Sequence, residues 1–115
     1  MSSYVMTQYV CPIEEHIAGS QSTSVDQLER LTWHPKSSVR LAVAENKNTP
    51  LKCIWALASD VDPDVRYQLA ENHQLPLSVL NMLTADENPY VACRARATIS
   101  RVQGEVAINN SIRFK

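Results

Sequence analysis

Apolar residues recur along the chain with a constant period of 26 residues, as at Val39, Val65 and Val91. Four apolar columns each repeat three times: Val25/Leu51/Leu77, Leu28/Ile54/Leu80, Leu31/Leu57/Leu83 and Val39/Val65/Val91. A fixed period of about 26 residues is the sequence signature of a repeat architecture. The pattern therefore favours three copies of one structural unit over three unrelated helical hairpins.

Within each unit, the spacing predicts two short helices. In the middle unit, apolar residues stand at positions 51, 54 and 57 and then at 65 and 69, so each set lies on one face of a helix. Thr49-Pro50 and Asp62-Pro63 each predict a capping side chain before a proline at the first helical position. Ser24 followed by Gln27 predicts a capping box. Helices this short are unstable alone in water, so neighbouring pairs must stack.

We therefore predict an all-α fold, a short solenoid of three helical pairs at about 24–48, 49–74 and 75–102. Residues 1–23 are interpreted as an N-terminal cap and linker, because they hold too many apolar residues for a plain tail. Gly104 predicts a helix stop. The remaining segment, 103–115, is a C-terminal tail that frays, folds back as a cap or docks on another chain.

The segment Asp60-Val-Asp-Pro-Asp-Val-Arg66, followed by Ala70-Glu-Asn and Pro76, resembles the leucine-rich repeat variant family over residues 24–101. That family belongs with the HEAT-like α-solenoids. The resemblance implies helix-rich units stacked into a right-handed superhelix. Some members carry an iron–sulfur cluster near the N-terminus, which needs several clustered cysteines. Only Cys11 lies in that region here, so we expect no cofactor.

The same resemblance implies a polar ladder between units that is formed by Asp60 and Arg66. A carboxylate in the turn and a guanidinium at the start of the next helix can satisfy each other. In the first unit the equivalent residues are His34 and Arg40. In the third unit they are Asp86 and Ala92, so the arginine is missing there. The sequence therefore predicts a complete pair in the middle unit only.

The formal charge of −1 favours neither nucleic acid nor membrane, but the charge is unevenly distributed. Residues 1–35 carry four acids against one arginine, a net of −3, and residues 89–115 carry five basic residues against Glu105, a net of +4. These ends either favour head-to-tail association or are simply solvated. Three distant cysteines, Cys11, Cys53 and Cys93, predict free thiols in a reducing compartment. With no signal peptide and no apolar run of membrane length, we expect a cytoplasmic protein.

No catalytic motif is evident. His16, His34 and His73 fall in different units without the spacing of metal ligands, and surface histidines are the simpler interpretation. Gly19 and Gly104 stand alone, so no phosphate-binding loop is predicted. We therefore expect a protein that is not an enzyme and binds no metal.

Exposed columns of the predicted helices carry aromatic residues and an arginine, which are typical of binding hot spots. The predicted partner-binding residues are Leu41, Trp55, Tyr67, Tyr90 and Arg94. Tyrosines that lie flat over the stack with wet hydroxyls are an equal alternative. Trp33, near the turn between helices, is predicted to be core.

The leading hypothesis is a non-catalytic module that binds a protein or peptide partner, with self-association through the open ends of the solenoid as a further expectation. The alternative is a nucleic-acid-binding protein of HEAT-like type with an arginine-lined concave face. The arginines available for that face are Arg40, Arg66, Arg94, Arg96 and Arg101.

Overall fold

The computed structural model describes the backbone of residues 13–113 and the side chains of residues 13–104, and this range holds helices and turns with no strand. The labelled helices are α2 (Val25–Leu31), α3 (Ser37–Glu45), α4 (Leu51–Leu57), α5 (Pro63–Ala70), α6 (Leu77–Leu83) and α7 (Pro89–Arg113). A further helix covers residues 13–19. The all-α prediction is confirmed for this range, while residues 1–12 of the predicted cap lie outside it.

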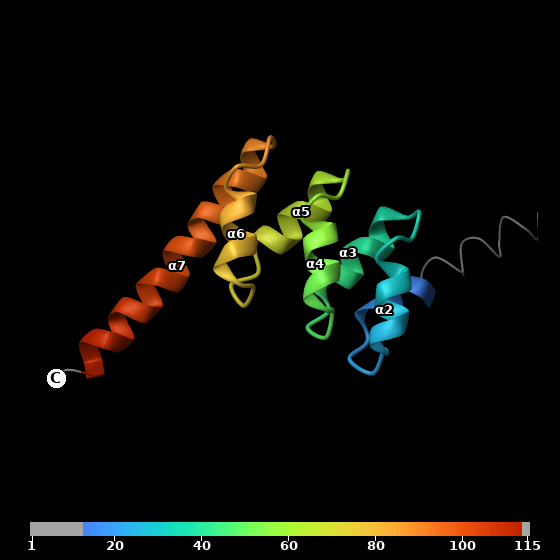
Figure 1. Cartoon of the computed structure of the whole chain (residues 1–115), viewed down its shortest axis with the longest axis horizontal. Coiled ribbons are helices and arrows are strands. Elements are labelled where there is room, and N and C mark those ends of the chain that lie inside the picture. Colours follow the sequence, from blue (N-terminus) through green and yellow to red (C-terminus); the bar gives the residue numbers. More distant parts are fainter. Residues whose placement is uncertain (1–12, 114–115) are drawn as a thin grey trace, which may run out of the picture.

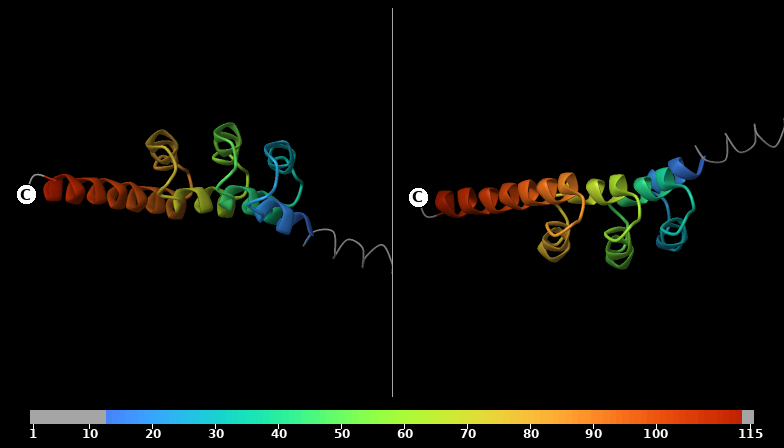
Figure 2. Two further views of the ribbon diagram at one scale, coloured as in Figure 1. Left: turned by 90° about the horizontal axis from the view of Figure 1, so that it is seen from below. Right: turned by 90° about the horizontal axis from the view of Figure 1, so that it is seen from above.

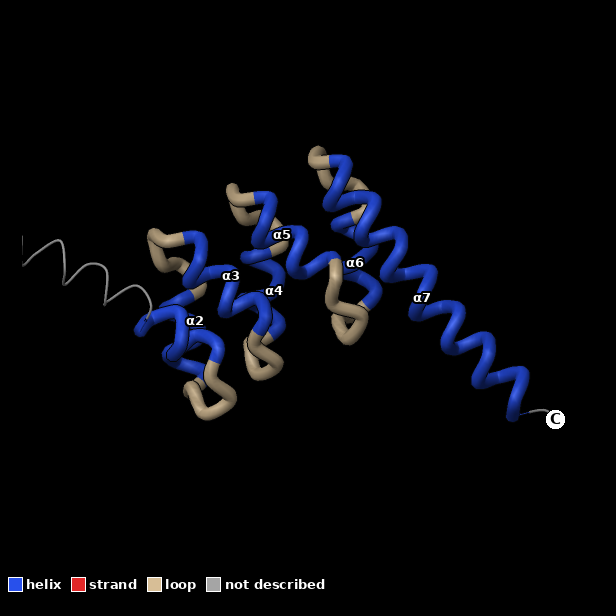
Figure 3. The backbone as a smooth tube through the Cα atoms, turned by 180° about the vertical axis from the view of Figure 1, so that it is seen from behind, coloured by secondary structure: helices blue, strands red, loops and turns tan. Residues whose placement is uncertain are grey.

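The helices form two rows (Figure 1). Helix 13–19, α3, α5 and α7 follow one another along the length of the molecule, and α2, α4 and α6 stand to one side of that row (Figure 2). Turns close the upper and lower ends of each pair (Figure 3). Within the first row, α5 packs against both α3 and α7, and from the second row α6 packs against α7. The first row is therefore the spine on which the shorter helices rest.

Three of the four predicted apolar columns supply the core. Val39, Val65 and Val91 are buried on the spine, and the column that starts with Leu28 is buried on the other row. The column Val25/Leu51/Leu77 is an exception, since these side chains are 49%, 49% and 43% exposed. Each is the first residue of its helix. Because the Cα–Cβ bonds of a helix tilt toward its N-terminus, these side chains lean past the helix end instead of onto the spine.

Two of the three predicted helix caps form as expected. The Ser24 hydroxyl accepts a hydrogen bond from the Gln27 amide at 3.2 Å, and the capping box is complete. The Asp62 carboxylate accepts one from the Asp64 amide at 2.8 Å, with proline at the first helical position. The prediction that Thr49 caps the N-terminus of α4 was wrong. The Thr49 hydroxyl instead donates to the Val43 carbonyl at 2.6 Å, so it closes the preceding helix, and Pro50 takes the N-cap position of α4.

The predicted helix stop at Gly104 was also wrong, because α7 continues through it to Arg113. In the two earlier turns, the side chains of Asn46 and Asn72 accept a hydrogen bond from the amide two residues later, at 2.9 Å in each case. A proline then follows at 50 and at 76. The equivalent residues of α7 are Thr98 and Val102, which allow a helix to continue, and a lone glycine costs a helix only about 1 kcal/mol. The predicted boundary at 102–103 therefore falls inside a helix.

Restoring the missing turn residues should end α7 early. In the double variant Thr98→Asn/Val102→Pro, proline removes an internal hydrogen bond and clashes with the preceding turn, at a cost of roughly 3 kcal/mol. We expect weaker far-ultraviolet circular dichroism at 222 nm and rapid amide exchange after residue 101. Thr98→Asn alone is the matched control and should keep the helix. An unchanged helical signal in the double variant would contradict this account of the length of α7.

Candidate functional site

A row of ion pairs joins successive turns of the molecule. Arg40 donates to both carboxylate oxygens of Asp60 at 2.7 and 3.1 Å, and Arg66 does the same to Asp86 at 2.8 and 3.2 Å. The Nη1 atoms donate in turn to the backbone carbonyls of His34 at 2.8 Å and of Asp60 at 2.5 Å. All four charged side chains are mostly buried. Two parallel bonds to one carboxylate are the strongest form of this interaction.

This geometry corrects the predicted pairing. Arg66 donates a hydrogen bond to the backbone carbonyl of Asp60, not to its carboxylate. The guanidinium of Arg66 pairs with the carboxylate of Asp86 instead. Each arginine therefore pairs with the aspartate of the next unit, 20 residues later, so Asp86 has a partner although Ala92 follows it. The hydrogen bond to Asp60 raises the pKa of the Arg40 guanidinium more than burial lowers it.

Helix 13–19 makes a third contact at the equivalent positions, but with the acid and the base exchanged: the acidic residue stands on the helix and the basic residue stands in the turn. Glu14 stands one repeat period before Arg40, and its Oε2 atom lies 2.5 Å from Nε2 of His34. His34 stands in the aspartate column and accepts a hydrogen bond at Nδ1 from the Lys36 amide at 3.0 Å. Asp60 likewise accepts from the Asp62 amide at 2.9 Å. The apolar period continues backward to Ile13 and Ile17, a signal that sequence reasoning missed.

The predicted partner-binding residues are divided between the two rows of helices. Leu41 and Tyr67 are partly buried and pack against the core, and Nε of Arg94 is buried without a hydrogen-bond partner. Tyr90 is 77% exposed on α7, whereas Trp55 is 37% exposed on α4, in the other row of helices. Since Arg40 and Arg66 are held by aspartates, an arginine-lined face would depend on the other three arginines, Arg94, Arg96 and Arg101.

Trp33, predicted to be core, is 75% exposed. It lies just beyond the end of α2, where Thr32 takes the buried position. Trp33 lines an open hollow of about 540 Å³ with Asp26, Glu29 and Arg30. It also lines two adjacent cavities, one of about 390 Å³ at the turns that follow α2 and α4, and one of about 300 Å³ between α2 and α4 themselves. Together they form what we name the Trp33 cleft. Its lining includes Glu29, Thr32, His34, Pro35, Lys52, Cys53, Ala56, Ser59 and Val61.

The Trp33 cleft has an apolar rim and charges that are already paired. Val61, which also lines the cleft, is 89% exposed. Nζ of Lys52 lies 2.9 Å from Oε1 of Glu29 across the gap between α4 and α2, and this hydrogen bond raises the pKa of Lys52. Because Lys52 is largely exposed, the pair adds little stability. The other units have Ser59 and Ala85 in the column of Trp33, and that contrast is the sequence signal that could have revealed the cleft.

Within residues 13–104, no three His, Cys, Asp or Glu side chains stand close enough to hold a metal ion. None of the described helices is long and apolar enough to cross a membrane. Comparison with protein-family models, with characterised proteins and with solved structures gave no significant match. The resemblance to the leucine-rich repeat variant family therefore depends on the residues quoted for it alone.

Removing one guanidinium of the ladder should destabilise the fold strongly. Arg66→Ala leaves the buried Asp86 carboxylate and the Asp60 carbonyl without their donor, which costs roughly 3 kcal/mol. We expect this loss in urea unfolding followed by circular dichroism. Arg96→Ala is the control: Arg96 is exposed and donates to the Thr84 carbonyl at 3.2 Å, so a change within about 0.5 kcal/mol is expected. Equal effects of the two substitutions would contradict the structural role of the ladder.

An arginine–aspartate pair, as in the other two contacts, should be able to replace the pair Glu14–His34. Glu14→Arg alone brings a cation to His34, and His34→Asp alone brings a carboxylate to Glu14, so each should destabilise the protein. The double variant should recover this loss with a coupling energy of about 1 kcal/mol or more, measured in a double-mutant cycle of unfolding free energies. Additive effects would show that helix 13–19 is not held by this pair.

Proposed function

We propose that the protein is a non-catalytic interaction module that binds a partner protein or peptide at the Trp33 cleft. The observation that carries the proposal is a tryptophan that is three-quarters exposed and lines two adjacent cavities. Tryptophan is among the residues most enriched in binding hot spots. Covering its ring removes roughly 150–250 Å² of surface from water, which makes it a strong anchor.

The proposal includes the architecture that presents the cleft. We interpret the helical pairs as a short solenoid of three units, in keeping with the resemblance to the leucine-rich repeat variant family. Support comes from contacts that recur one repeat period apart, such as Arg40 with Asp60 and then Arg66 with Asp86. These ion pairs stiffen the turns on which Trp33 and Val61 stand. A rigid platform favours binding because less side-chain and loop freedom is lost on association.

The size and chemistry of the cleft favour a peptide-like partner. Cavities of about 300 and 390 Å³ that share Trp33 as a lining residue are large enough for apolar side chains of a peptide. The rim charges of Glu29 and Lys52 neutralise each other, so the cleft does not select for the phosphate backbone of a nucleic acid. Trp55 and Tyr90, as exposed aromatics, are retained as secondary contacts. We also propose that the module acts in the reducing environment of the cytoplasm, and the free thiols of Cys53 and Cys93 support this.

Replacing Trp33 should abolish partner binding without harming the fold. We expect a photo-reactive phenylalanine analogue at position 61, in the exposed lining of the cleft, to form adducts with discrete proteins in cells. The additional substitution Trp33→Ala should reduce those adducts at least tenfold while changing the unfolding free energy by less than about 0.5 kcal/mol, because the side chain is exposed. Tyr90→Ala is the matched control, since it removes an equally exposed aromatic from α7. Adducts that survive Trp33→Ala would overturn the proposal.

A further inference from the structure

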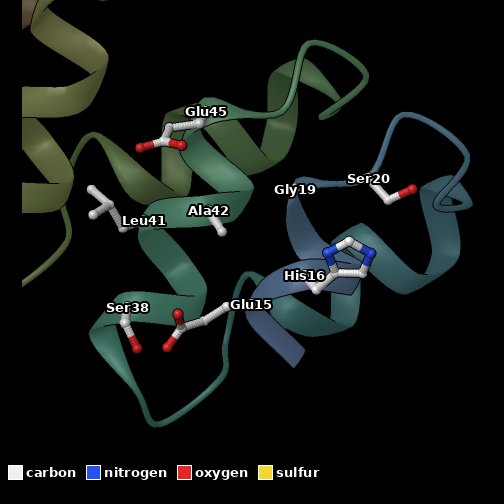
Figure 4. A pocket seen from close by; sticks show the side chains of 8 residues that line it. All are labelled: Glu15, His16, Gly19, Ser20, Ser38, Leu41, Ala42 and Glu45. Carbon is white, nitrogen blue, oxygen red and sulfur yellow. The ribbon is translucent and has the colours of Figure 1, made fainter. Parts of the chain in front are cut away.

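A groove of about 600 Å³ lies between helix 13–19 and α3, and we name it the N-terminal groove (Figure 4). Its lining is Glu15, His16, Gly19 and Ser20 on one side and Ser38, Leu41, Ala42 and Glu45 on the other. Small residues keep it open. A Cβ atom added at Gly19 would meet no atom within 4 Å, whereas the later units place glutamates at the equivalent positions 45 and 71. Ala42 is likewise followed by longer side chains, Gln68 and Arg94.

The N-terminal groove combines an apolar floor with unpaired negative charge. Leu41 and Ala42 lie between Glu15, on helix 13–19, and Glu45, on α3 (Figure 4). Neither carboxylate forms an ion pair with another described residue. A complementary partner must therefore offer aliphatic side chains beside basic ones.

The other end of the molecule offers that chemistry. The distal part of α7 projects beyond α6 with no described element beside it (Figures 1 and 3). The sequence from residue 105 onward is EVAINNSIRFK, which combines the aliphatic residues Val106, Ala107, Ile108 and Ile112 with the positive charges of Arg113 and Lys115. A short helical segment without a tertiary partner, such as the part of α7 from residue 105 onward, is marginally stable in water. Docking on a second surface would stabilise it.

We propose that the distal part of α7 in one copy occupies the N-terminal groove of a second copy. The groove and the projecting helix lie at opposite ends of the chain, so one copy cannot make this contact with itself (Figure 1). Opposite charges at the two ends, −3 over residues 1–35 and +4 over residues 89–115, favour this contact. Such a head-to-tail interface leaves one groove and one helix free, and it therefore builds chains or closed rings. This contact goes beyond the proposed function, since the Trp33 cleft is a different surface.

Charge exchange between the two surfaces tests the proposal in the full chain. The first variant, Glu15→Lys/Glu45→Lys, makes the groove basic, and the second, Arg113→Glu/Lys115→Glu, makes the end of the chain acidic. For the wild-type chain, sedimentation velocity over a concentration series should show a mass that rises with concentration and falls with added salt. Each variant alone should associate more weakly by on the order of tenfold or more. An equimolar mixture should regain association, because an acidic helix end then meets a basic groove.

Three results would overturn the proposal. The first is a wild-type chain that stays monomeric at low salt, and the second is a mixture of variants that fails to associate although both keep the wild-type circular dichroism. In the third, deletion of residues 1–12 turns a monomer into an oligomer, which would identify that segment as the occupant of the groove. Trp33→Ala should leave self-association unchanged. Loss of self-association alone therefore counts against this contact and not against partner binding at the Trp33 cleft.

Discussion

A buried guanidinium must be paired, and in this protein that requirement links each turn to the next. The Arg40 and Arg66 side chains are nearly enclosed, so each needs a carboxylate and a carbonyl acceptor at fixed distances. The acceptors come from two different turns, and the bonds form only when both turns lie in one relative position. The ion pairs therefore specify how successive helical pairs are placed, whereas the apolar residues mainly supply the driving force for packing.

The placement of each helical pair against the next matters for stability because the helices are short. The helices α2, α4 and α6 each have seven residues, which is too few for stability outside a tertiary structure. They gain it by burying one face on the spine, in which α5 packs against both α3 and α7. At the N-terminal end, Glu14 and His34 make the same link as a carboxylate–imidazole pair. Helix 13–19 thus continues the spine by one further helix (Figure 2).

The candidate surfaces arise where the repeat is broken. Trp33 stands in a column of small residues, and it is left exposed because Thr32 occupies the buried position beside it. The N-terminal groove opens where Gly19 and Ala42 replace longer side chains. The projecting end of α7 results from a turn in which asparagine and proline have been lost. Both proposed binding surfaces therefore lie at departures from the sequence period.

The sequence by itself determined the helical class, the repeat period, most of the buried columns and the caps at Ser24 and Asp62. These features depend on helix periodicity and on contacts between near neighbours in the chain, which are written in the local sequence. Only the tertiary structure decided that Arg66 pairs with Asp86, that the column of Leu51 is half exposed and that Trp33 faces solvent. Ion-pair partners from different turns meet through the placement of whole units. The exposure of a residue near a turn likewise depends on which neighbour covers it, and neither property is encoded in local spacing.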